Sequence, residues 1–139
     1  MASIGNGIGE NMEDRYLFKA KHFDEWHIGN IVKEPSGLYI RDIKENVMAS
    51  IDDESTICQC TGLRDKNGKL IWENDIMVAH LDDAYPEDET YIRILWYESG
   101  FCSKEKGSED ISPIDKFDQE HFEVCGNIFD NPQLLESEG

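Results

Sequence analysis

Four histidines, His22, His27, His80 and His121, carry the side chains of this sequence that titrate closest to neutral pH without perturbation. No two of them have the His-x-x-x-His spacing of a helical metal site, and none adjoins a serine or cysteine in a recognised nucleophile motif. We therefore expect surface or hairpin-edge positions for all four. The sequence predicts no catalytic residue, and we do not expect an enzyme.

Four cysteines could in principle bind a metal ion. Cys58 and Cys60 are two positions apart, which places both thiols on one side of a strand, whereas Cys102 and Cys125 each stand alone. A zinc site prefers paired Cys-x-x-Cys knuckles, which this chain lacks. We predict buried, reduced packing thiols, and neither metal ligands nor a cofactor.

Carboxylates are abundant, but their arrangement is not that of a known ligand loop. The clusters Asp82-Asp83 and Glu87-Asp88-Glu89 lack the alternating oxygen ligands and central glycine of a calcium loop. The glycine-rich motifs that bind phosphate, Gly-x-Gly-x-x-Gly and Gly-x-x-x-x-Gly-Lys, do not occur. The acidic stretch is expected to be a solvated loop.

Net charge limits the class of partner. Thirteen Lys and Arg against thirty Asp and Glu give a formal charge of −17, which repels nucleic-acid phosphates. Two interpretations of this acidity stay open at this stage. It either keeps the protein soluble, or it attracts a basic protein partner.

The sequence gives no sign of a membrane segment. No apolar run approaches the ~20 residues needed to span a bilayer. Residues 1–11 lack the basic and apolar regions of a signal peptide, so we expect a flexible leader or a tag remnant there. These features, with the unpaired cysteines, predict a cytoplasmic protein.

The length of 139 residues predicts a single domain over residues 12–136, divided into an N-terminal meander, 12–55, and a C-terminal part, 56–136. The patterns predict a mainly β chain with little helix. One helical turn is expected at Ser112–Phe117, and a capped turn after Asn131. The expected strands are Tyr16–Ala20, Trp26–Val32, Leu38–Arg41, Thr56–Thr61, Asp75–His80, Tyr91–Tyr97, Phe101–Lys104 and Phe122–Phe129.

Asn67-Gly68 is the clearest turn signal in the chain. This dipeptide readily takes positive φ at both centres of a tight hairpin turn, so we expect such a turn between two strand-like runs. Further along, alternation places Ile92, Ile94 and Trp96 on one face of a strand. We assign Trp96 to the core.

Three separated blocks carry a family resemblance: Cys60-Thr61-Gly62-Leu63-Arg64-Asp65-Lys66-Asn67-Gly68, then Ile71-Trp72-Glu73-Asn74-Asp75-Ile76-Met77, then Gly126-Asn127-Ile128-Phe129-Asp130-Asn131-Pro132. Their order resembles that of the YopX family, small proteins typical of bacteriophages and prophages. Cys60 replaces a frequent aromatic residue and Asn74 a usual glycine, but asparagine tolerates positive φ well.

The resemblance implies a small barrel of the Src-homology 3 (SH3) type in the C-terminal part, with the N-terminal meander packed on it, and it brings no established activity. We expect a phage or prophage accessory protein, a non-enzymatic acidic module that binds an unknown protein partner or a second copy of itself. The candidate partner-binding residues are Trp72 and the hairpin-tip cations Arg64, Lys66 and Lys69. The alternative is a nucleic-acid module that binds weakly through the 64–69 tip.

Overall fold

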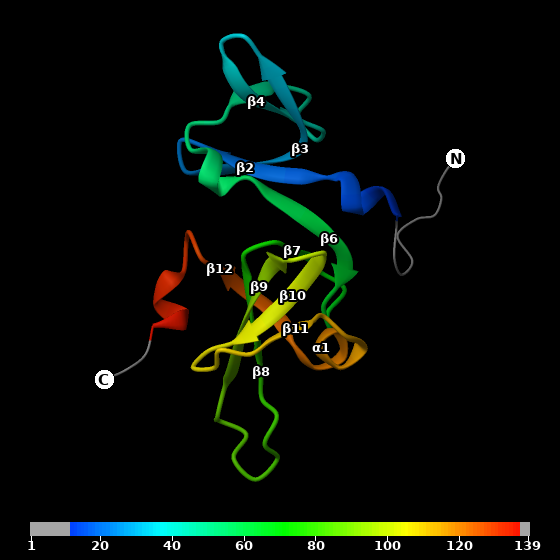
Figure 1. Cartoon of the computed structure of the whole chain (residues 1–139), viewed down its shortest axis with the longest axis vertical. Helices are drawn as coiled ribbons and strands as arrows, with labels where there is room; N and C mark the ends of the chain where they lie inside the picture. Colours follow the sequence, from blue (N-terminus) through cyan, green and yellow to red (C-terminus); the bar gives the residue numbers. More distant parts are fainter. Residues whose placement is uncertain (1–11, 137–139) are drawn as a thin grey trace. The chain divides into compact units, whose positions relative to one another are not determined.

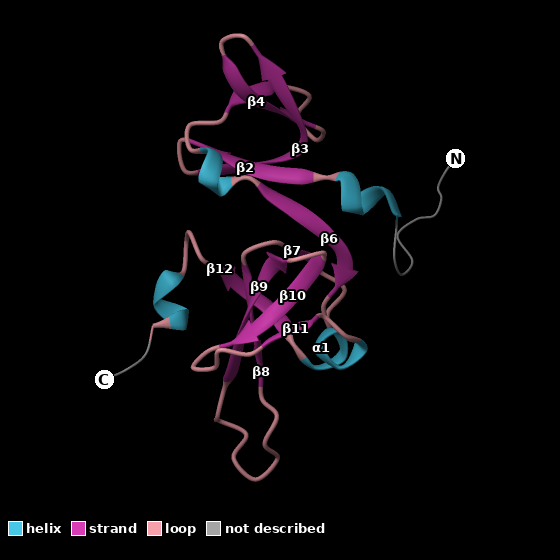
Figure 2. Cartoon of the chain, viewed as in Figure 1, coloured by secondary structure: helices cyan, strands magenta, loops and turns pink. Residues whose placement is uncertain are grey.

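The computed structural model describes residues 12–136, and strands make up most of its regular structure (Figure 1, Figure 2). The prediction of a mainly β chain with little helix is confirmed. The strands form two antiparallel sheets, and no closed barrel is detected within residues 12–136. The strands are β2 Phe18–His22, β3 Glu25–Glu34, β4 Gly37–Asp42, β5 Met48–Ser50, β6 Cys58–Arg64, β7 Leu70–Trp72, β8 Asp75–Ala79, β9 Thr90–Tyr97, β10 Gly100–Glu105, β11 Ile111–Pro113 and β12 Glu123–Asn127.

Helical structure is confined to short segments. They are η1 Met12–Tyr16, η2 Glu54–Thr56, α1 Lys116–His121 and η3 Pro132–Leu135. No helix within residues 12–136 is long and apolar enough to cross a membrane.

The chain divides into two compact units, Met1–Gly62 and Leu63–Gly139, so the division falls within β6. The expected single domain over 12–136, with its internal boundary after residue 55, stays a prediction. The leader expected at residues 1–11 lies outside the described part of the chain.

The first unit is built on a meander, because β2 pairs antiparallel with β3, β3 with β4, and β4 with β5. A two-residue turn at Phe23 and Asp24, both with positive φ, joins β2 to β3. A small apolar cluster of Ala20, Ile40 and Ala49 forms its core. The sheet that contains the meander has the order β5-β4-β3-β2-β6-β7.

The second unit contains the other sheet, with the order β11-β10-β9-β8-β12. Figure 1 shows the loop between β8 and β9 projecting beyond the ends of these strands. The sheet is open where a closed SH3-like barrel was expected. The core of the second unit consists of Ile71, Met77, Ala79, Ile92, Ile94 and Phe122.

The turn at Asn67-Gly68 differs in type from the prediction. Only Gly68 has positive φ, and the turn is wider, since the Asp65 N–H donates to the Lys69 carbonyl at 2.8 Å. A one-residue left-handed position at the end of a longer turn is a common hairpin geometry. The predicted tight turn with two positive φ angles is therefore wrong, although the hairpin exists.

Three further expectations are corrected. Trp96 is 50% exposed and lies outside the core, because β9 extends beyond the apolar cluster that covers Ile92 and Ile94. Cys125 is exposed, while the other three cysteines are buried. Ser112 lies in β11, and α1 begins later, at Lys116, with Asp115 as its cap.

Other local predictions are confirmed. Asn74 takes positive φ in the two-residue bend between β7 and β8. The last expected strand is present as β12, and its register against β8 shifts at a bulge between Val124 and Gly126. Pro132 opens η3 after Asn131, as expected, but the Asn131 side chain makes no capping hydrogen bond to this turn.

Candidate functional site

The basic hairpin tip expected from the sequence is partly neutralised. Arg64 donates from Nη1 to the Gly68 carbonyl at 2.8 Å, within its own turn. Lys66 Nζ lies 3.9 Å from Glu123 Oε1, while Lys69 is exposed. The structure therefore brings the three cations onto one hairpin, but Glu123 of β12 lies beside Lys66.

Asp65 holds this hairpin together. Its Oδ1 accepts from the N–H groups of Asn67 and Lys69 at 2.8 and 2.9 Å, and its Oδ2 accepts from the Val124 N–H at 2.8 Å. Because three main-chain donors converge on one buried carboxylate, Asp65 ties the turn to β12.

Trp72, the other predicted partner-binding residue, is 6% exposed and offers little surface. The main-chain N–H of Trp72 donates to the buried Asp75 carboxylate at 2.7 Å across the β7–β8 bend. The structure therefore places Trp72 in the interior, apart from the exposed cations of the tip.

An aromatic pair of exposed Trp96 and half-buried Phe101 lies at the β9–β10 hairpin, where the sequence predicted a core residue. Trp96 and Phe101 are opposite each other in the strand register, with ring centroids 4.9 Å apart and an edge-to-face angle of 83°. Tyr97, the next residue, is 47% exposed. The pair therefore presents aromatic surface on a hairpin, where a partner can reach it.

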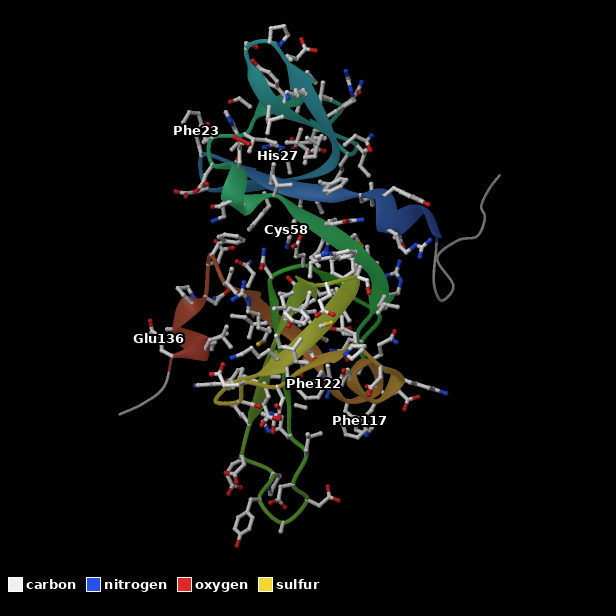
Figure 3. The ribbon with its side chains drawn as sticks, viewed as in Figure 1. Phe23, His27, Cys58, Phe117, Phe122 and Glu136 are labelled. Carbon is white, nitrogen blue, oxygen red and sulfur yellow. The ribbon has the colours of Figure 1, made fainter. Side chains whose placement is uncertain are left out.

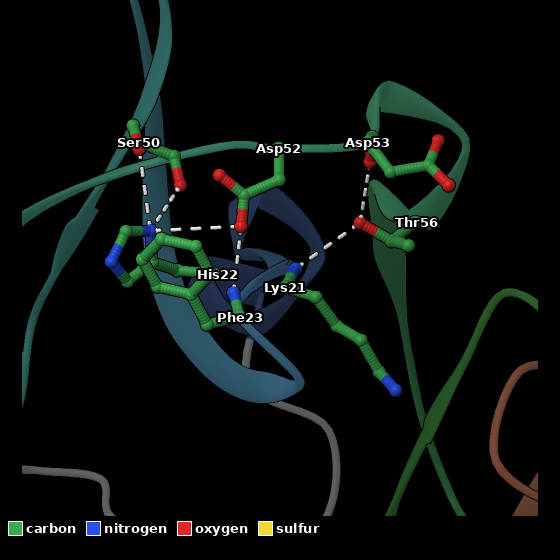
Figure 4. A network of polar contacts seen from close by, with 7 residues as sticks. All are labelled: Lys21, His22, Phe23, Ser50, Asp52, Asp53 and Thr56. Atoms are coloured by element: carbon green, nitrogen blue, oxygen red, sulfur yellow. Dashed lines mark hydrogen bonds and ion pairs between the residues drawn. The ribbon is translucent and has the colours of Figure 1, made fainter.

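A histidine, a serine and an aspartate meet in the first unit, and their geometry excludes a catalytic triad (Figure 4). His22 Nδ1 is 2.9 Å from the Ser50 carbonyl oxygen, 3.2 Å from Ser50 Oγ and 3.8 Å from Asp52 Oδ2. A triad needs the serine and the carboxylate on opposite ring nitrogens. Here all three oxygens surround one nitrogen, so the contacts anchor the β2–β3 turn.

His80 and His121 make the same kind of structural contact. Nδ1 of His80 is 2.7 Å from the Pro86 carbonyl oxygen, and Nδ1 of His121 is 3.0 Å from the Phe117 carbonyl oxygen. A ring nitrogen that donates to a main-chain carbonyl fixes the local chain. Both residues are exposed, as the sequence predicted.

His27 differs from the other histidines because it is buried, contrary to the surface position expected for all four, and it lines a hollow of about 450 Å³. Figure 3 labels its side chain in the first unit. His27 comes from β3, Asp42 from the end of β4, and Glu45 from the loop that follows. The His27 Nδ1 donates to Asp42 Oδ2 at 2.9 Å. One ligand atom from each of these three residues lies within 4.8 Å of the others.

The loop after β4 is folded around the Asp42 carboxylate. Asp42 Oδ1 accepts from the N–H groups of Lys44 and Glu45, each at 2.8 Å. The Glu45 N–H is the main cause that lowers the pKa of Asp42; the contacts with His27 and Lys44 add to it, and burial opposes it. Asp42 is thus a carboxylate that stays ionised at neutral pH.

Sequence reasoning missed this cluster because its members lie on two strands and a loop. A usable signal existed in Glu34-Pro35-Ser36-Gly37. A two-residue turn there pairs Glu34 with Gly37, and the same register brings Gly29 opposite Asp42, two residues from His27.

The chain was compared with known protein families. The sequence model of one family, described as "YopX protein", matches residues 14–136. The chain belongs to the YopX family. Its motif residues Asp65 and Asn74 have the architectural roles described above, in the turn and the bend.

A crystal structure of protein EF1440 from Enterococcus faecalis is similar to this YopX chain. The two are 27% identical, the match covers 77% of this chain and 74% of the other, and the TM-score is 0.47. A search of curated proteins finds no match.

Proposed function

We propose that this YopX protein is a non-enzymatic phage or prophage accessory module that binds a basic protein surface. The observation that carries the proposal is exposed Trp96, packed edge-to-face on half-buried Phe101, on a chain of net charge −17. Tryptophan is enriched at the energetic centres of protein interfaces. Its indole face also attracts Lys and Arg side chains through cation–π contact.

The acidic charge and the aromatic pair favour the same class of partner. A field of net charge −17 draws basic surfaces and repels nucleic acid and, at low salt, a second copy of the chain. The β9–β10 hairpin is held by ladder pairing from Gly100 with Tyr97 to Glu105 with Ile92. Such a hairpin presents Trp96 at small entropic cost on binding.

The nucleic-acid alternative has less support. Lys66 lies beside Glu123, and Arg64 is engaged by its own turn, so the tip holds little unopposed positive charge. RNA binding through the tip, if present, would weaken steeply with salt and would disappear in a Lys69→Glu variant.

The test is affinity capture from an extract of bacterial cells with the full chain, a Trp96→Ala variant and a Tyr85→Ala control. Tyr85 is 58% exposed in the β8–β9 loop, so its removal matches the loss of aromatic surface elsewhere in the unit. We expect a basic protein that the wild-type chain and the control retain, that the Trp96 variant loses, and that high salt releases.

Light scattering on the purified chain completes the test. A monomer that captures no protein would overturn the proposal, and so would capture that is equal for all three forms. A dimer that Trp96→Ala dissociates would keep the interaction surface but replace the basic partner by a second copy.

A further inference from the structure

The hollow in the first unit gathers three metal-binding side chains that the sequence did not connect. We propose that His27, Asp42 and Glu45 bind one divalent transition-metal ion of the zinc class. One ring nitrogen and one oxygen from each carboxylate lie within 4.8 Å of one another, and all three residues line the same hollow. This proposal is independent of the protein-binding function proposed above.

The contact between His27 and Asp42 has the spacing of two ligands of one ion. His27 is 8% exposed and Asp42 6%, and Nδ1 of His27 lies 2.9 Å from Asp42 Oδ2. Two ligands that bind zinc tetrahedrally at about 2.0–2.2 Å lie about 3.4 Å apart, so the ion can take the place of the Nδ1 proton with little movement. The imidazole then carries its proton on Nε2, the ring nitrogen that has no hydrogen-bond partner.

The donor set favours one class of ion. One imidazole nitrogen with two carboxylate oxygens suits zinc and its neighbours in the first transition row. Calcium and magnesium prefer ligand sets made of oxygen alone. Two carboxylates also balance the charge of a divalent ion, while Lys44 and Glu25, which line the same hollow, add one charge of each sign.

The site combines two fixed residues with one adjustable residue. His27 and Asp42 are buried on neighbouring strands, and two main-chain N–H groups fix the Asp42 carboxylate. Glu45 is exposed on the loop. Ligand atoms bind zinc at about 2.0–2.2 Å, so closure around an ion needs only a small movement, which Glu45 can supply.

The experiment is a titration of the full ¹⁵N-labelled chain with zinc chloride, followed by NMR of backbone amides and histidine ring nitrogens. We expect saturation at one ion per chain, with shifts confined to residues 25–28 and 42–46. The His27 ring nitrogen that takes the ion will move most. Glu45→Gln should weaken binding about tenfold or more, and His27→Gln at least as much.

The matched control is Glu34→Gln, an exposed glutamate at the end of β3 in the same unit, which should bind zinc as the wild type does. The proposal is overturned if Glu45→Gln binds equally well, or if the shifts centre on Cys58 and Cys60. Displacement of zinc by an equal concentration of calcium would also overturn it. Because Glu45 is exposed, its variant decides the question even if His27→Gln does not fold.

Discussion

Two buried aspartates, one in each unit, have the same exposure and nearly the same turn chemistry. Asp42 and Asp65 are each 6% exposed. In both, Oδ1 accepts two N–H groups from the loop that follows. The two residues differ at Oδ2. In Asp65 this oxygen accepts a hydrogen bond from the Val124 N–H, and in Asp42 it accepts one from Nδ1 of His27.

This difference shows that burial alone does not mark a functional carboxylate. All the donors on Asp65 are main-chain groups, which cannot change protonation state, tautomer or identity. The last donor on Asp42 is an imidazole whose second nitrogen has no partner and which lines a hollow. Asp65 is therefore a structural residue, whereas the Asp42 cluster retains bonding capacity for a ligand.

The largest expected effect comes from the structural carboxylate. Asp65→Ala leaves three main-chain donors without their acceptor, so we expect it to lower the free energy of unfolding by about 3–5 kcal/mol. Urea denaturation followed by tryptophan fluorescence measures the change. The matched control is Asp82→Ala, since the exposed Asp82 carboxylate accepts a single loop N–H from the described residues, that of Ala84, at 2.9 Å. A loss for Asp65→Ala as small as that of the control would contradict the assigned role.

Asparagine substitutions sharpen the comparison. An asparagine side chain has only one oxygen acceptor. At position 65 its NH₂ group would therefore face a main-chain N–H, which is also a donor, and we expect the free energy of unfolding to fall by about 2–3 kcal/mol. At position 42 the NH₂ group faces His27, whose Nδ1 can accept a hydrogen bond in its other tautomer. At position 42 we expect the free energy of unfolding to fall by only about 1 kcal/mol. Equal losses in the same denaturation experiment would remove the distinction between the two carboxylates.

The sequence predicted the strands well because their signals are local. Alternating and β-branched residues specify strands, and the family motif indicated the hairpin and the Asn74 bend. The turn type was wrong because the Asp65 side chain, which Asn67-Gly68 alone does not reveal, sets its width. Trp96 was misplaced because alternation gives the face of a strand but not where the core beneath it ends.

The candidate metal cluster depends on contacts between strands, which composition and spacing do not show. His27 and Asp42 are 15 positions apart and meet only through the β3–β4 register. Sequence reasoning looked for the His-x-x-x-His or Cys-x-x-Cys spacing, and the chain has neither. The pair of Trp96 and Phe101 was missed for a similar reason, since Phe101 meets Trp96 across a hairpin.

A smaller effect tests how far the Asp65 turn depends on its glycine. Gly68 has φ of +83°, and a Cβ added there meets nothing within 4 Å. The cost of Gly68→Ala is therefore backbone strain alone, about 1 kcal/mol. Gly100→Ala is the control, because that position has open space without a positive φ. If both variants unfold at the same urea concentration, the left-handed position is not constraining the turn.

The smallest expected effect concerns a carboxylate with fewer donors than Asp42 or Asp65. Asp118, in the capping box of α1, accepts the Asp115 N–H at 3.2 Å. Burial raises the pKa of Asp118 above its ordinary 3.8, and the nearby charge of Asp115 adds to this rise. Because Asp118 has few hydrogen-bond donors, burial decides the direction of its pKa shift, whereas at Asp42 the hydrogen bonds outweigh burial.

The sign of the pH dependence follows from this raised pKa. The folded protein keeps the Asp118 proton to a higher pH than the unfolded chain, so ionisation disfavours folding as pH rises above about 4. Asp118→Asn removes this loss and keeps an oxygen acceptor. Its stability relative to wild type should rise between pH 3 and pH 7 by less than about 1 kcal/mol, because the group is half exposed. Thermal unfolding at several pH values measures the difference, with Glu120→Gln on the same helix as the control. A relative stability that falls with pH would show that the Asp115 N–H, and not burial, controls the Asp118 carboxylate.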